Sequence, residues 1–180
     1  MQLALAGLVN ERYEMMSPGY ATLAVPELET AEQFTLWAIR SWVEAHKASA
    51  PIFDRLAKGF DLAGAPDGLF ALDEMLSVIA ASSCVQIDVR CVRCQSIGDG
   101  ESAMLKILVA AQAGHLTSVR DGLASWLPPA AVRMAADAAR RFAASLWSVG
   151  MVLPSRQQLP VAARQEAISH CPDPGIRLRQ

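Results

Sequence analysis

The strongest constraint on the fold is a regular apolar repeat in residues 129–149. Its apolar side chains recur in alternating steps of three and four residues, at Val132, Ala135, Ala139, Phe142, Leu146 and Val149. This spacing lines them up along one side of an α-helix, and it is typical of the seam between packed helices. We therefore expect one long helix that buries a single face against its neighbours.

Similar patterns predict helices along most of the chain. The clearest apolar stripe, in residues 66–83, consists of Leu72, Met75, Leu76, Ile79, Ala80 and Ser83. Further helices are expected over residues 3–16, 30–48, 99–113 and 116–127, and one starting near residue 51. The connections are short and marked by proline and glycine, which favours antiparallel neighbours. We predict an all-α, compact, bundle-like domain of six or seven helices in residues 1–153. Residues 154–180 should form an extended C-terminal tail, packed on this domain or on a partner.

The inward faces of these helices define a predicted core. Eight residues should be nearly fully buried: Leu72, Leu76, Ile79, Ile107, Leu108, Leu123, Phe142 and Leu146. The helix expected at 30–48 carries a second apolar face, formed by Leu36, Ile39 and Val43, so it should touch neighbours on two sides. Thr30 is its expected N-cap, because a threonine oxygen can accept hydrogen bonds from free backbone N–H groups.

Residues 84–95 interrupt the helical pattern. Val85, Ile87 and Val89 alternate there with polar residues. Strict alternation is typical of a short strand with one buried face, but an extended loop with three inward side chains fits equally well. We expect at most one short β element, near residues 85–89.

The same segment holds three of the four cysteines. Cys91 and Cys94 have the C-x-x-C spacing at which two thiolates from one turn can bind zinc. Cys84 could supply a third ligand, and His170 or Cys171 could complete the set. A thiol redox pair is an alternative, although no βαβ pattern surrounds it. Ordinary packing of the three cysteines is the remaining interpretation.

The composition favours self-association. Apolar residues make up 52% of the 180 residues and charged residues 19%, below the roughly 25% of ordinary domains. We therefore expect a homodimer, which would cover the second face of helix 30–48 and the stretch at 85–89, and a further protein partner is possible. The net charge of −2 makes nucleic acid an improbable partner. No apolar run approaches the roughly 20 residues of a membrane span.

The chain start lacks the positively charged region of a secretory leader, so we expect a cytoplasmic protein whose cysteines are free thiols or metal ligands. Abundant alanine, and arginine in place of lysine, suggest a GC-rich bacterium. The four tryptophans and the arginines of the last helix could contact ligands. Core packing of the tryptophans, and a solvated helix face on which Asp137 pairs with the arginines, are the favoured interpretations.

These observations favour a non-enzymatic cytoplasmic bacterial interaction or regulatory protein, because no Walker loop, GxGxxG or nucleophile elbow is present in the sequence. The first alternative is a metal-binding or thiol-redox protein centred on Cys91, Cys94 and Cys84. The second is a helical ligand- or DNA-binding regulator, suggested by the pairing of helices 116–127 and 129–149. Against DNA binding, the second helix carries too few polar base-reading residues at its start, which is Ala130, Ala131 and Val132.

Overall fold

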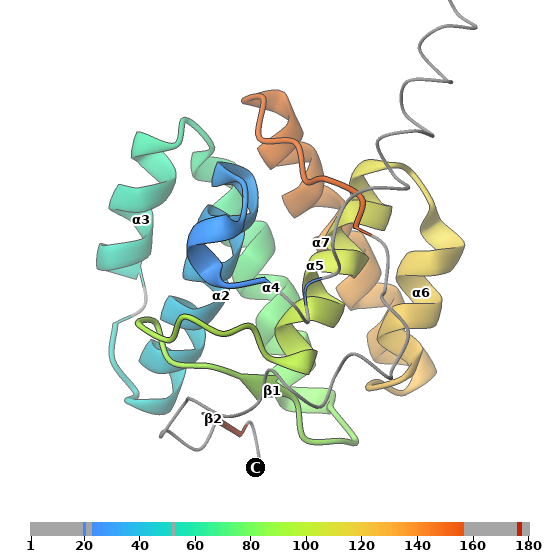
Figure 1. Cartoon of the computed structure of the whole chain (residues 1–180). Coiled ribbons are helices and arrows are strands. Elements are labelled where there is room, and N and C mark those ends of the chain that lie inside the picture. The colour runs from blue at the N-terminus through green and yellow to red at the C-terminus, as the bar shows by residue number, and fades with distance from the viewer. Residues whose placement is uncertain (1–19, 21–22, 52, 157–175, 178–180) are drawn as a thin grey trace, which may run out of the picture.

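The computed structural model describes residues 20, 23–51, 53–156 and 176–177, and this part of the chain is all-α, as predicted (Figure 1). Its elements in chain order are the short 3₁₀ helix η2 (Val25–Glu27), α2 (Thr30–Lys47), α3 (Phe53–Leu62), α4 (Pro66–Ser82), β1 (Asp88–Val89), α5 (Asp99–Gln112), α6 (Leu116–Ala124), α7 (Pro129–Ser148) and β2 (Ile176–Arg177). The helix expected at 3–16 lies outside the described residues. None of the helices in the described ranges is long and apolar enough to cross a membrane.

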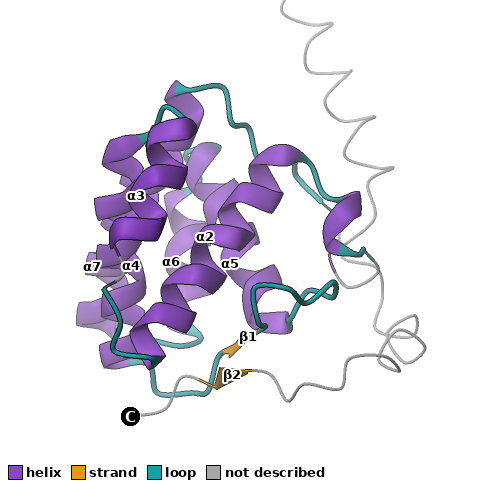
Figure 2. Ribbon diagram, turned by 90° about the vertical axis from the view of Figure 1, so that its left-hand side faces the viewer, coloured by secondary structure: helices purple, strands orange, loops and turns teal. Residues whose placement is uncertain are grey.

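The centre of the fold is the packing of α4 against α7. Helix α5 packs beside α7, α6 contacts both α5 and α7, and α3 lies against α4. Helix α2 contacts α3, α4 and α5, so it joins the two sides of the bundle (Figure 2). All eight predicted core residues are nearly fully buried, which confirms the assignment of the inward faces. Helices α4 and α7 each begin with a proline. Proline fits at this position because the first helical residue needs no backbone N–H donor.

Helix α2 corrects two predictions. Its N-cap is Glu29, one residue before the predicted Thr30, and the backbone N–H of Glu29 donates to Glu32 Oε2 at 2.8 Å. A carboxylate three residues into the helix can reach back to that donor, and Glu32 does so. The second apolar face is also not a dimer surface, because Leu36, Ile39 and Val43 are buried within the same chain.

The tryptophans divide between the core and the surface. Trp42 is fully buried, and its Nε1–H donates to Asp73 Oδ1 at 2.7 Å. Trp37 and Trp126 pack partly buried against the core, as predicted. The expectation for Trp147 was wrong: it lies near the end of α7 with 57% of its surface exposed. A position beside an apolar stripe therefore does not by itself place a side chain in the core.

The segment between α4 and α5 contains the expected short β element. Strand β1 pairs antiparallel with β2, Asp88 opposite Arg177 and Val89 opposite Ile176 (Figure 2). Ile87 and Val89 are buried within the same chain while Val85 is exposed, so two of the three apolar residues expected at a dimer surface do not face it. The close approach of β1 to α5 requires Gly100, because a Cβ there would overlap the Asp88 carbonyl oxygen and Ile87.

Candidate functional site

A buried ion pair joins α2 to α5 beneath the cysteine-containing segment. Arg40 Nε lies 2.7 Å from Glu101 Oε1, and Arg40 Nη2 lies 2.9 Å from Glu101 Oε2. The two side chains are only 2% and 0% exposed. This bidentate geometry is the strong form of an arginine–carboxylate pair, and we refer to these two residues as the Arg40–Glu101 clamp.

The clamp also binds the backbone of the segment at four points. Arg40 donates to the carbonyl oxygens of Cys94 and Ser96, at 2.6 and 2.7 Å. Glu101 accepts the backbone N–H groups of Arg90 and Gly98, at 3.0 and 2.7 Å. Buried charges cost free energy unless hydrogen bonds surround them, and here both groups are surrounded. The clamp therefore fixes the path of residues 90–98.

Between these attachment points, Cys91 and Cys94 occupy the two ends of one β-turn. The N–H of Cys94 donates to the carbonyl of Cys91 at 3.1 Å, with Val92 and Arg93 at the central positions. The two cysteines therefore share one turn, the arrangement that the C-x-x-C spacing favours. Cys91 is half-buried, whereas Cys94 is 8% exposed, and Cys94 Sγ lies 3.3 Å from Ser96 Oγ.

The charged residues next to this turn differ in their environment. The Arg90 guanidinium lies 3.2 Å from the Asp88 carboxylate, so this cation is already paired. The Arg93 side chain is exposed. In the sequence Arg90 precedes Cys91 and Arg93 precedes Cys94, and in the structure Arg93 is the more accessible of the two.

The third predicted ligand, Cys84, lies apart from this arrangement. It is exposed just after α4, where its backbone N–H donates to the carbonyl oxygen of Trp126 at 2.8 Å. Across the described ranges, no three His, Cys, Asp or Glu side chains are grouped so that they could hold a metal ion. His170 and Cys171 lie outside those ranges, so a zinc site that uses them stays a prediction.

A second buried ion pair lies in the first turn of α2. Arg156 donates from Nε and Nη2 to the two carboxylate oxygens of Glu32, both at 2.6 Å. The Arg156 guanidinium also lies 5.8 Å from the centre of the Tyr20 ring. Burial, and next the Glu32 carboxylate, raise the pKa of Tyr20 above its ordinary value. This group ties the segment after α7 to the start of the described chain.

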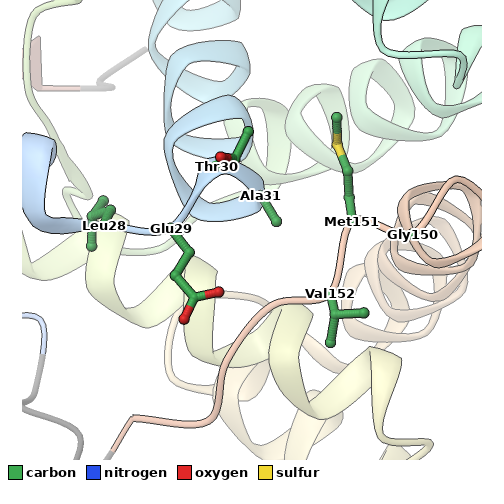
Figure 3. Close-up of a pocket in the computed structure, with 7 residues that line it drawn as sticks. All are labelled: Leu28, Glu29, Thr30, Ala31, Gly150, Met151 and Val152. Atoms are coloured by element: carbon green, nitrogen blue, oxygen red, sulfur yellow. The ribbon is translucent and has the colours of Figure 1, made fainter.

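An open cavity of about 480 Å³ lies between the start of α2 and the segment after α7 (Figure 3). Its lining consists of Leu28, Glu29, Thr30, Ala31, Gly150, Met151 and Val152. Glu29 supplies the one carboxylate among these residues and Thr30 the one hydroxyl. The cavity has room for a small ligand, but its lining provides no nucleophile–base pair.

Two further features lie on the surface of the described helices. On α3 and α4, the exposed rings of Phe53 and Phe70 lie 6.1 Å apart. On α7, Asp137 pairs with Arg140 at 2.8 Å and with Arg141 at 3.0 Å, and Arg141 also reaches Glu74 of α4 at 2.6 Å. The interpretation of this arginine face as solvated and ion-paired is therefore confirmed for Arg140 and Arg141.

Sequence reasoning missed both buried ion pairs. The available signals were Arg40, set among apolar residues of a helix with two apolar faces, and Glu101, three residues after Gly98 at a helix start. Neither signal identifies its partner, because the residues of each pair are far apart in sequence. No protein-family model matches the chain, and no curated protein or solved structure is significantly similar to it.

Proposed function

We propose that this protein is a non-enzymatic cytoplasmic bacterial interaction protein that forms a homodimer through the outer face of α3 and α4. The observation that carries the proposal is the aromatic pair Phe53 and Phe70, which are 42% and 64% exposed with ring centres 6.1 Å apart. Exposed aromatic rings that touch across two helices form a continuous apolar surface, and such surfaces mark sites of association.

The charges around this pair support a second copy of the chain as the partner. Asp67 and Glu74 lie one turn before and one turn after Phe70 on α4, and Arg141 is paired with Glu74. A two-fold symmetric interface brings the same patch together twice, so a patch that contains both signs can form pairs across the axis. The low overall content of charged residues agrees with a chain that covers some of its surface.

The test is the molar mass of the purified protein, measured by size-exclusion chromatography with light scattering at micromolar concentration. We expect about twice the chain mass of 19.3 kDa. Phe70→Glu should give a monomer, because it places two like charges at the interface. Trp147→Glu is the matched control, since this exposed aromatic residue belongs to α7 and lies outside the proposed face.

Circular dichroism should show that both variants remain folded, because each replaced side chain is mostly exposed. A monomeric wild-type protein would refute the homodimer. A dimer that survives Phe70→Glu would place the interface on another surface.

A further inference from the structure

The β-turn at residues 91–94 meets the distance requirement of a disulfide. A β-turn keeps the Cα atoms of its first and fourth residues less than about 7 Å apart. Disulfides join Cα atoms that are about 4.4–6.8 Å apart. The hydrogen bond from the Cys94 N–H to the Cys91 carbonyl maintains this turn in the reduced protein.

The Arg40–Glu101 clamp holds the turn from both ends. Glu101 binds the N–H of Arg90, immediately before Cys91, and Arg40 binds the carbonyl of Cys94. These contacts have already fixed the backbone that a disulfide would otherwise have to order. Because less conformational entropy remains to be lost, ring closure between the two cysteines is favoured in the folded protein.

The two thiols differ in accessibility, and this assigns them different roles. Cys91 is half-buried and therefore open to a reagent in solution, whereas Cys94 is 8% exposed and lies beside Ser96 Oγ. A dissolved disulfide can reach Cys91 first. Cys94 is positioned to complete the reaction from inside the turn.

We propose that Cys91 and Cys94 form a reversible thiol–disulfide site that exchanges with low-molecular-weight disulfides of the glutathione type. The Cys91 thiolate attacks one sulfur of the reagent, the S–S bond of the reagent breaks, and one thiolate leaves. The Cys94 thiolate then attacks the Cys91 sulfur of the mixed disulfide and releases the second thiolate. The two cysteines are oxidised to one disulfide, the reagent is reduced to two thiols, and the two cysteine protons end on these thiols.

The sequence makes this reaction easy to follow. Trypsin cleaves after Lys58, Arg90, Arg93, Lys106, Arg164 and Arg177, so the four cysteines fall on four different peptides: 59–90, 91–93, 94–106 and 165–177. Each possible pairing of cysteines therefore gives a different cross-linked product. The full-length protein is incubated in glutathione buffers of increasing oxidised-to-reduced ratio, alkylated and digested for mass spectrometry.

We expect the loss of two alkylatable thiols and a mass decrease of two hydrogen atoms, with peptides 91–93 and 94–106 cross-linked. A reducing dithiol should reverse both changes. The double variant Cys84→Ser, Cys171→Ser is the matched control and should react like the wild type. Cross-links that involve peptide 59–90 or 165–177, or no thiol loss under oxidising conditions, would overturn the proposal.

Two single variants test the assigned roles. Cys94→Ser should accumulate glutathione on Cys91, because the thiol that resolves the mixed disulfide is gone. Cys91→Ser should react much more slowly, because the remaining thiol is buried; equal rates for the two variants would overturn the order of attack. The folded protein should also reach half-oxidation at a lower oxidised-to-reduced ratio than the urea-unfolded chain, and the reverse order would refute preorganisation by the clamp.

Discussion

Replacing Glu101 with glutamine tests the Arg40–Glu101 clamp directly. Each carboxylate oxygen of Glu101 accepts two hydrogen bonds: Oε1 from Arg40 and the Arg90 N–H, and Oε2 from Arg40 and the Gly98 N–H. Glutamine has the same shape but only one acceptor oxygen. Its amide group would face two donors, and the Arg40 charge would stay buried without a counter-charge.

The expected loss of stability in Glu101→Gln is large for a change of one functional group. Removal of one partner of a buried ion pair typically costs about 3–5 kcal/mol, because the remaining charge is left uncompensated. Domains of this size have about 5–15 kcal/mol of stability, so Glu101→Gln should still fold. Urea denaturation followed by tryptophan fluorescence and circular dichroism measures the free energy of unfolding.

The matched control is Glu44→Gln, which removes the same charge from an exposed pair with Arg55. Exposed pairs contribute about 0–1 kcal/mol, so this variant should stay close to the wild type. If the two variants lose similar amounts of stability, the clamp is not the structural centre that its geometry indicates.

A double variant separates the ion pair from its role in holding the loop. Replacement of a buried pair by apolar residues is often neutral when the pair only contacts itself. In Arg40→Met, Glu101→Leu, four backbone groups at residues 90, 94, 96 and 98 would also lose their partners. We therefore expect the double variant to remain destabilised, and a return to wild-type stability would refute the loop-holding role.

Three further predictions concern the core, a close backbone approach and pH. Leu76→Ala should cost about 2–5 kcal/mol in urea denaturation, because Leu76 is buried, whereas exposed Leu62→Ala should change little. Gly100→Ala should destabilise the fold more than Gly114→Ala in the same assay: a Cβ at Gly100 collides with Asp88, while Gly114 (φ +75°) faces open space and carries only the left-handed backbone cost of about 1–2 kcal/mol. The raised pKa of Tyr20 stabilises the fold fully below the unfolded pKa of about 10, and this contribution is lost as the pH rises beyond it. The urea midpoint of the wild type should therefore fall relative to Tyr20→Phe between about pH 9 and 11, and parallel curves would contradict this assignment.

The sequence by itself determined the helices, because their signals are local. Apolar spacing of three and four residues gave the inward faces of α4 and α7, prolines marked where both helices begin, and Gly150 marked the end of α7. It also predicted the turn that contains Cys91 and Cys94, since only two residues separate them. Each of these features depends on interactions within a few residues, which a linear pattern can report.

Only the tertiary structure decided which polar residues work together. Arg40 and Glu101 are 61 residues apart, and Glu32 and Arg156 are 124 apart. A single charged residue in a helix gives the same sequence signal whether it faces water or a buried partner, because the partner is brought to it by folding. For the same reason the second face of α2 could be mistaken for a dimer surface: apolar spacing indicates that a face is covered, but not whether the same chain or another one covers it.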